Sequence, residues 1–247
     1  MANLEPLIQS IPVAPLKLAS LEGCRTLADQ VNNYLVSFRH ESPTNVGQAD
    51  SLQGYCADSY LLECECPRFG SGEGKGVLKE SVRGCDLFIM VDVTNYSLTY
   101  RVNGYENHMS PDNHYQDLKR IISAADGKAR RINVIMPFLY EGRQHKRSKR
   151  ESLDCALMLQ ELVDMGVSNI LTFDAHDPRV SNSIPLHGFD SFMPTYQFLK
   201  ALVNSVPDFV IDNDHLMIIS PDEGAMGRAV YFSNILGVDM GMFYKRR

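Results

Sequence analysis

The 247-residue sequence lacks the features of several specialised protein classes. It has no excess of basic residues, since 24 Lys and Arg stand against 30 Asp and Glu, and the net charge of -6 argues against nucleic acid as a partner. No apolar run reaches the ~18–20 residues of a membrane span, so no membrane is expected. Residues 1–10 lack the basic start of a secretory signal. The composition, 44% hydrophobic and 22% charged, is that of a soluble globular protein.

The sequence also lacks an ordered cysteine pattern. Its six cysteines form neither a dense disulfide framework nor a pair of CxxC metal knuckles. Cys64 and Cys66 stand two apart in an alternating segment, so we expect both to face the same buried side of a strand. This cysteine usage predicts a reducing, cytoplasmic compartment.

From Cys85 onward, short apolar runs alternate with segments of helical periodicity, which predicts parallel βαβ units and an α/β fold. The predicted strands are 86–93, 132–137, 169–175, 216–221 and 238–244. The predicted helices are 113–126, 151–165, 195–205 and 226–236. Ligands of such sheets bind at the carboxyl ends of the strands, which is where most polar motifs of this chain fall.

The N-terminal third has a less regular pattern. Residues 20–35 are predicted to form a helix, and the polar stretch near 38–58 an insertion or loop. The glycine-rich run 70–76 does not match a P-loop, because Phe69 stands where the first glycine is required and Gly76 where Ser or Thr should follow the lysine. A flexible hairpin tip is the other interpretation.

A basic run follows the predicted strand 132–137. Its five cations are Arg143, Lys146, Arg147, Lys149 and Arg150. One interpretation is a polyphosphate clamp, because arginine binds phosphate through paired hydrogen bonds and the next helix adds backbone donors at its N-terminus. The other is a solvated basic loop. The position at the carboxyl end of a strand favours the clamp.

Two acidic turns follow predicted strands in the same way. Asp174 and His176 close one strand, and their two-residue spacing predicts a carboxylate and an imidazole on one face, which suits Mg²⁺. Asp222 follows the strand 216–221. Helix capping is the alternative role for these aspartates. Lys245 and Arg247, taken alone, are an ordinary basic tail.

Taken together and in this order, short segments of the chain resemble the signature of the ribose-phosphate diphosphokinases, also called phosphoribosyl pyrophosphate synthetases. The segments are 68–73 (RFGSGE, similar to "RFSDGE"), 80–89 (ESVRGCDLFI, similar to "ESVRGxDVFI"), 137–144 (PFLYEGRQ, similar to "PYxxYARQ"), 173–176 (FDAH, similar to "VDLHA"), 220–224 (SPDEG, similar to "SPDxGG") and 245–247 (KRR). The resemblance covers roughly residues 60–247.

The resemblance implies a transferase. Ribose 5-phosphate takes diphosphate from Mg-ATP, which gives phosphoribosyl diphosphate, a nucleotide precursor, and AMP. It further implies Mg²⁺ as cofactor, ATP and ribose 5-phosphate as partners, and a homo-oligomer built from dimers, often a hexamer. The implied α/β fold has a phosphoribosyltransferase-like parallel-sheet domain over 1–191 and an incomplete second domain of the same type over 192–247.

The resemblance also implies roles for single residues. The ATP-binding residues would be Phe69, Ser71, Glu73, Arg143 and Gln144, with Phe69 stacked on adenine. The residues serving the metal-bound phosphates would be Asp174, His176 and Asp222. The catalytic residues, which stabilise charge on the transferred group, would be Lys245 and Arg247.

The chain departs from the family pattern at several positions. Ser71 replaces the Asp of "SDGE", which leaves more of the base selection to Glu73, and His145 replaces the Asp that follows Arg-Gln. No segment matches the ribose-5-phosphate loop, an Asp-Asp and Thr-Gly-Thr motif that lies downstream of the basic triplet in the family. We therefore expect these 247 residues to be a truncation that binds ATP weakly and turns over poorly.

Two other functions stay open. A catalytically silent regulatory or associated subunit would keep the fold and bind nucleotide; Ser71 and the missing loop favour it, while the Arg143–Gln144 pair and the basic triplet count against it. A type I phosphoribosyltransferase would need the missing Asp-Asp loop and does not explain the Arg-Gln segment.

Overall fold

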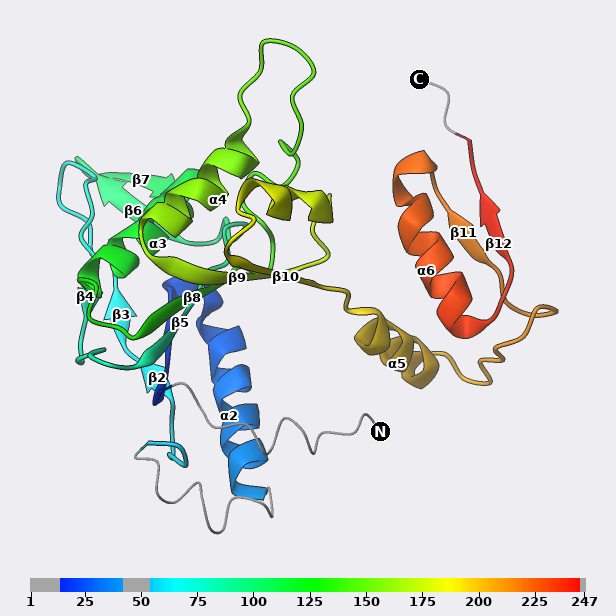
Figure 1. Ribbon diagram of the computed structural model, residues 1–247, viewed down its shortest axis with the longest axis horizontal. Helices are drawn as coiled ribbons and strands as arrows, with labels where there is room; N and C mark the ends of the chain where they lie inside the picture. Colours follow the sequence, from blue (N-terminus) through cyan, green and yellow to red (C-terminus); the bar gives the residue numbers. More distant parts are fainter. Residues whose placement is uncertain (1–13, 42–53, 245–247) are drawn as a thin grey trace. The chain divides into compact units, whose positions relative to one another are not determined.

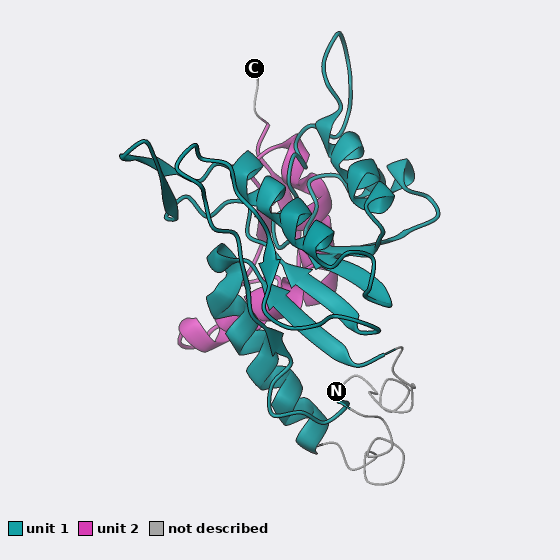
Figure 2. Ribbon diagram, turned by 90° about the vertical axis from the view of Figure 1, so that its left-hand side faces the viewer, with its two compact units in different colours: residues 1–192 teal, residues 193–247 magenta. Residues whose placement is uncertain are grey.

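The computed structural model describes residues 14–41 and 54–244 (Figure 1). The chain divides into two compact units, residues 1–192 and 193–247, which are coloured separately in Figure 2. The domain boundary expected from the sequence, between 191 and 192, lies beside this division. Each unit is described by itself.

Unit 1 is built on a six-stranded sheet in the order β10-β9-β8-β5-β1-β2, and every neighbouring pair runs parallel. The strands are β1 (Leu16–Ser20), β2 (Leu61–Leu62), β5 (Asp86–Met90), β8 (Arg131–Ile135), β9 (Val167–Phe173) and β10 (Gly188–Phe192). The α/β fold with a parallel sheet is therefore confirmed. Since all strands point the same way, the loops that follow β1, β5, β8 and β9 gather at one edge of the sheet.

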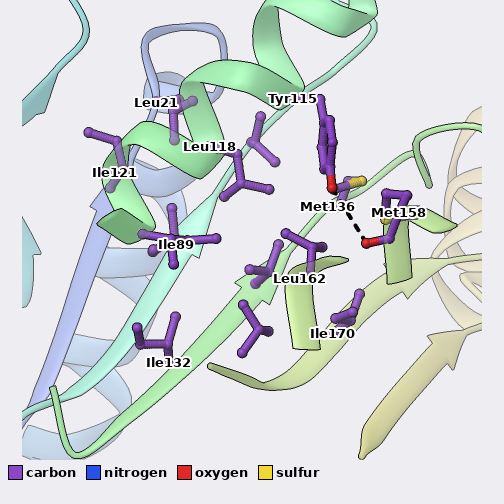
Figure 3. Close-up of a cluster of buried hydrophobic side chains, with 14 of the residues drawn as sticks. Leu21, Ile89, Tyr115, Leu118, Ile121, Ile132, Met136, Met158, Leu162 and Ile170 are labelled. Carbon is purple, nitrogen blue, oxygen red and sulfur yellow. Dashed lines mark hydrogen bonds between the residues drawn. The ribbon is translucent and has the colours of Figure 1, made fainter. Parts of the chain in front are cut away.

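Helices cover both faces of this sheet. Helices α3 (Pro111–Ala124) and α4 (Asp154–Asp164) pack on one face in the larger hydrophobic cluster, shown in Figure 3, and α2 (Arg25–Glu41) packs on the other. Strand β5 shows the alternation that this requires: Leu87 and Ile89 join the larger cluster, whereas Met90 joins the smaller one with Leu18 of β1. A parallel strand that is buried on both faces forms a nearly continuous apolar run, and this run predicted β5 from the sequence.

Two antiparallel hairpins project from the connections of unit 1. Strands β3 (Cys64–Glu65) and β4 (Val77–Leu78) form the first, and β6 (Thr99–Val102) and β7 (Tyr105–His108) form the second. The second turns at Asn103 and Gly104, which have φ values of 49° and 85°. A two-residue turn with both φ values positive matches the twist of a hairpin, and Asn-Gly is its preferred sequence. In the first hairpin Cys64 is buried and Cys66 packs against the core, as the alternation predicted.

The N-terminal third differs from the sequence prediction. Ser20 ends β1 rather than starting a helix, a short 3-10 turn η1 (Glu22–Cys24) follows, and α2 continues to Glu41. Residues 38–41 of the expected polar insertion are therefore helical, and 42–53 lie outside the described residues. The predicted helix is thus present over residues 25–35, but its bounds were wrong. Its inner face is Ala28, Val31, Asn32 and Leu35, a helical spacing that begins only after β1 and η1.

Unit 2 is a smaller α/β element. It contains α5 (Thr195–Ser205), β11 (Ile218–Ser220), the turn η5 (Glu223–Ala225), α6 (Met226–Leu236) and β12 (Met240–Met242). Strands β11 and β12 pair in parallel with α6 between them in the chain. Helix α6 ends at Gly237, whose φ of 68° suits a glycine C-cap. None of the helices in the described parts of either unit is long and apolar enough to cross a membrane.

Candidate active site

The residues expected to contact adenine lie at the tip of the β3–β4 hairpin. The tip is a tight turn, in which Phe69 N–H donates to Glu73 C=O (2.7 Å) and Gly72 N–H donates to Phe69 C=O (2.9 Å). Phe69 is 54% exposed, which leaves its ring open to a planar partner. The Ser71 hydroxyl donates to Oε2 of Glu73 (2.8 Å), so this serine holds the carboxylate to which the family resemblance gives base selection.

The glycines of this hairpin have a packing role. A Cβ on Gly74 would lie 2.3 Å from Nη1 of Arg68, and a Cβ on Gly76 would lie 2.4 Å from the carbonyl oxygen of Arg120. The guanidinium of Arg68 forms two hydrogen bonds of 2.8 Å with the carboxylate of Asp117 on α3. The run 70–76 is thus a hairpin tip that passes closely over α3, and the hairpin interpretation is confirmed.

The basic run lies in the long connection between β8 and α4. Its five cations are all exposed. Gln144, in contrast, is fixed at the base of the loop: its Nε2 donates to Ser152 C=O (2.6 Å), its N–H donates to Glu141 C=O (2.8 Å), and its own C=O accepts from Cys155 N–H (3.4 Å). The hydrogen bonds of Gln144 therefore fix the start of the loop at the carboxyl edge of the sheet. The side chain of Arg143 and those of the other cations lie in solvent.

The segment after β9 turns sharply at Asp174. This residue has a φ of 44°, and its N–H donates to Phe192 C=O of the neighbouring strand (2.9 Å). The strand ends at Phe173, so regular alternation does not continue through the half-buried Asp174 to the exposed His176. Asp177 then caps the 3-10 turn η4 (Pro178–Ser183) by accepting from Arg179 N–H (3.0 Å).

His145 and Asp177 bring the basic loop and the β9 segment together. The rings of His145 and His176 have centroids 5.1 Å apart with planes at 58°, and Nε2 of His145 lies 3.6 Å from Oδ2 of Asp177. Hydrogen bonds from the Arg179 guanidinium, with a smaller contribution from nearby His145, hold the pKa of Asp177 well below its usual value. The sequence named the loop and the strand end as site segments but gave no role to Asp177.

Asp222 belongs to unit 2, where it caps the turn before α6. Its Oδ1 accepts from Ala225 N–H (3.1 Å), and its C=O accepts from the buried hydroxyl of Ser220 (2.7 Å). The capping role weighed for this aspartate is therefore present, and one carboxylate oxygen remains for another partner. Lys245 and Arg247, the predicted catalytic pair, lie outside the described residues.

The structure does not bring the predicted nucleotide residues of unit 1 into one cluster. The β3–β4 tip and the β8–α4 loop lie far apart in both views (Figure 1, Figure 2). A cavity of about 480 Å³ does lie beside the first hairpin, lined by Arg68, Tyr100 of β6 and residues of α3. The β6–β7 wall of this cavity was not predicted, although Asn103-Gly104 is a strong hairpin signal.

No group of three or more His, Cys, Asp or Glu side chains within the described ranges is arranged to hold a metal ion. Asp174 and His176 alone therefore give a partial donor set. Such a set suits a cation that takes its other ligands from water or phosphate oxygens.

The fold and these strand-end loops define an α/β protein with a polar, partly basic ligand edge. A sequence profile for the N-terminal domain of ribose phosphate pyrophosphokinase matches residues 16–166, so the chain belongs to this family. Ribose-phosphate pyrophosphokinases of Staphylococcus epidermidis and Staphylococcus aureus are 28% and 27% identical to it, each over 191 residues. These alignments cover 76% of this chain and 53% of each relative, so the chain spans about half the length of the curated relatives it matches.

A solved structure supports the fold. The chain is similar to phosphoribosylpyrophosphate synthetase from Mycobacterium smegmatis, with a TM-score of 0.71 and 23% sequence identity. The similarity covers 94% of this chain and 65% of that one. It extends the fold assignment beyond the profile match to nearly the whole chain.

Proposed function

We propose that the protein acts in diphosphoryl transfer from ATP to ribose 5-phosphate, as the names of its relatives indicate. The observation that carries this proposal is the meeting of the Arg143–Gln144 loop with the His176 segment at the carboxyl edge of the sheet, through His145. Cations and imidazoles at such an edge suit a polyphosphate. The relatives carry enzyme names, which favours this function over a catalytically silent subunit.

The proposed reaction forms one bond and breaks another. The 1-hydroxyl oxygen of ribose 5-phosphate bonds to the β-phosphorus of ATP, the bond from that phosphorus to the α–β bridging oxygen breaks, and AMP leaves while the hydroxyl proton is released. The protein has little covalent chemistry to perform, so its contribution is positioning and charge stabilisation. We assign stabilisation of the charge on the transferred diphosphoryl group to Lys245 and Arg247, and binding of the nucleotide phosphates to Arg143 and Gln144.

We assign adenine recognition to the β3–β4 tip. The exposed Phe69 ring offers a stacking surface, and the Ser71 hydroxyl leaves Oε1 of Glu73 to accept from an amino group on the base. Ser71 replaces the Asp of the family pattern, and a second carboxylate there would stand beside Glu73 and repel it.

Mg²⁺ fits the donor set on chemical grounds. When bound with ATP it would supply charge neutralisation at the phosphates, and one or two protein carboxylates would be enough to hold it. In unit 1, Asp174 would offer a carboxylate and His176 would donate to phosphate oxygens; Asp222, taken by itself in unit 2, would offer a carboxylate there. A small set of protein donors is what a metal needs when it binds together with ATP, because the phosphates and water supply its other ligands.

We further propose a homo-oligomer in which two copies share each nucleotide site. The β3–β4 tip, to which we assign adenine, and the β8–α4 loop of Arg143 and Gln144, to which we assign the triphosphate, lie far apart in unit 1 (Figure 1, Figure 2). This supports a site completed by the hairpin tip of a second copy. We also propose that unit 2 is the first part of a second phosphoribosyltransferase-like domain, since its β11–α6–β12 order is a parallel βαβ element. The cytoplasm is the proposed compartment, because all six cysteines are free thiols.

Calorimetry with Mg-ATP tests the nucleotide part of the proposal. Arg143→Ala should weaken binding by about tenfold, the effect of losing one charge-assisted contact. Arg130→Ala is the matched control, since Arg130 is an exposed arginine just before β8 at the opposite edge of the sheet. AMP release that depends on ribose 5-phosphate tests the transfer. Equal weakening by both variants would sink the assignment of the loop.

A further inference from the structure

The imidazole ring of His145 makes a hydrogen bond through one nitrogen and has its other nitrogen near a carboxylate. Nδ1 lies 3.1 Å from the carbonyl oxygen of Arg143, which can only accept, so this nitrogen carries hydrogen and donates. Nε2 points the other way and lies 3.6 Å from Oδ2 of Asp177. The side chains of His145 and Asp177 are both only 13% exposed, although the neighbouring cations of the loop are in solvent. The ring therefore has a fixed place between two segments.

The carboxylate of Asp177, which lies beside this ring, is held in place by Arg179. Its Oδ1 accepts from both the N–H and Nε of Arg179 (3.0 and 2.9 Å), and its Oδ2 accepts from Nη2 of the same arginine (2.5 Å). These bonds close the start of η4 and leave the carboxylate little freedom to rotate. The His145 ring therefore lies beside a carboxylate whose position is fixed relative to β9, because η4 follows that strand.

His176 itself lacks such support. It is exposed, and it follows the turn at Asp174 rather than lying in the regular strand. The aromatic face available to it is that of His145, with centroids 5.1 Å apart and planes at 58°, a tilted geometry that aromatic pairs favour.

We propose that His145 is a positioning residue: it fixes the ring of His176 by aromatic packing while joining the triphosphate loop to the β9 segment through Arg143 and Asp177. The family pattern places Asp at position 145, and a carboxylate there would face the carboxylate of Asp177 without a ring to pack on His176. This inference rests on the proposed function only where it concerns ATP. The position of the His176 ring is a separate and directly measurable quantity.

The experiment uses the full 247-residue chain labelled with ¹⁵N, and it compares His145→Ala with His145→Phe. The Phe variant keeps a flat ring beside His176 but loses both nitrogens. His187→Ala is the control, because His187 is another exposed histidine of unit 1. Two quantities are measured: the imidazole ¹⁵N–¹H signals of His176, assigned by their loss in His176→Asn, and the dissociation constant of Mg-ATP by calorimetry.

His145→Ala should shift the His176 ring signals towards those of a freely rotating histidine and weaken Mg-ATP binding about three- to tenfold, the ratio set by one aromatic contact. His145→Phe should restore the ring signals, and His187→Ala should leave signals and affinity unchanged. Unchanged His176 signals in His145→Ala overturn the proposal. If the Ala variant loses its circular dichroism, the Phe variant decides: a mobile His176 ring there also overturns it. Absence of Mg-ATP binding in the unaltered chain counts against the proposed function alone, since the ring signals still decide the role of His145.

Discussion

Asp117 is the buried charge on which the first hairpin depends. Its side chain is 7% exposed, and it accepts two hydrogen bonds from Arg68 and a third, of 2.6 Å, from Arg120. Removing one partner of a buried ion pair leaves uncompensated charge, which costs far more than an exposed pair contributes. The carboxylate therefore ties the glycine-rich hairpin to α3.

Asp117→Asn should lower the free energy of unfolding by about 3 kcal/mol, because two guanidiniums lose their anionic partner. Urea unfolding followed by circular dichroism measures this. Asp126→Asn is the matched control: Asp126 pairs with Lys128 in solvent, and its loss should leave the unfolding midpoint unchanged. Similar effects of the two variants would contradict the buried role of Asp117.

The buried thiols predict a loss of stability at alkaline pH. Burial raises the pKa of Cys24, Cys64 and Cys155 to about 11 and that of Cys66 to about 12, against a usual value near 9. Above pH 9 the unfolded chain releases these protons while the folded chain keeps them, so the free energy of unfolding should fall as the pH rises from 9 towards 11 or 12.

Urea midpoints measured at a series of pH values check this prediction. Cys56→Ser should leave the slope unchanged, because Cys56 is exposed. At pH 8, a disulfide reagent should modify Cys56 well before the buried thiols. A flat stability profile between pH 9 and 11 would show that the buried thiols ionise alike in the folded and unfolded chains.

At the scale of elements, the β3–β4 hairpin depends on close contact with α3. A Cβ on Gly76 would lie 2.4 Å from the backbone oxygen of Arg120, which cannot move without distorting the helix, whereas a Cβ on Gly70 would meet nothing within 4 Å. Gly76→Ala should therefore destabilise unit 1 by about 1–3 kcal/mol, the range for overpacking.

Gly70→Ala is the control for this prediction, since it adds the same methyl group at the open tip and should change stability by less than about 0.5 kcal/mol. Amide hydrogen exchange on β4 gives a local measurement beside the urea midpoint. Equal effects of the two alanines would mean that the contact with α3 does not restrict the hairpin.

Sequence patterns predicted some elements well and missed others for physical reasons. Helices α5 and α6 were predicted with their observed bounds, and β5, β8 and β9 within a few residues, because buried parallel strands form continuous apolar runs. Strands β2, β3 and β4 have two residues each, too few for any periodicity. They are set by tertiary contacts, which a single-sequence pattern does not contain.

The candidate site was predictable to the same degree. Loops after β8 and β9 were recognised from their polar residues, but contact between them depends on His145 and Asp177, which lie 32 positions apart in the sequence. Asp174 and His176 were expected on one face because strand side chains alternate between faces. The turn at Asp174, with its φ of 44°, ends this alternation. The separation of the hairpin tip from the basic loop is a tertiary arrangement, which residue spacing does not show.

At the scale of the whole molecule, the two units differ in how much they bury. Unit 1 contains both hydrophobic clusters, whereas the buried residues of the described part of unit 2 are few and small: Thr195, Ser220, Ala229, Ser233 and Val238. Burial of apolar side chains dominates folding free energy, so local stability should follow the same order.

Amide hydrogen exchange should show this difference. Amides of β5 and β8 should exchange at least about 100-fold more slowly than those of β11 and β12, since each 1.4 kcal/mol of local stability gives a factor of ten. The amides of α2, an exposed helix of unit 1, provide an internal reference for helices with little burial. Equal protection in the two strand pairs would mean that unit 2 has stabilising contacts beyond its own buried residues.

The β6–β7 hairpin has a consequence for how the chain can change over evolution. Met109 N–H donates to Leu98 C=O at 2.9 Å, so the two ends of the hairpin stand one hydrogen bond apart. The path from β5 to α3 would close over the same gap without residues 99–108. A deletion or lengthening of the hairpin would therefore leave the register of the six-stranded sheet unchanged, and its cost would fall on the β3–β4 tip, where Asn103 N–H donates to Gly70 C=O (3.3 Å) and the Arg68 guanidinium lies over the Tyr100 ring.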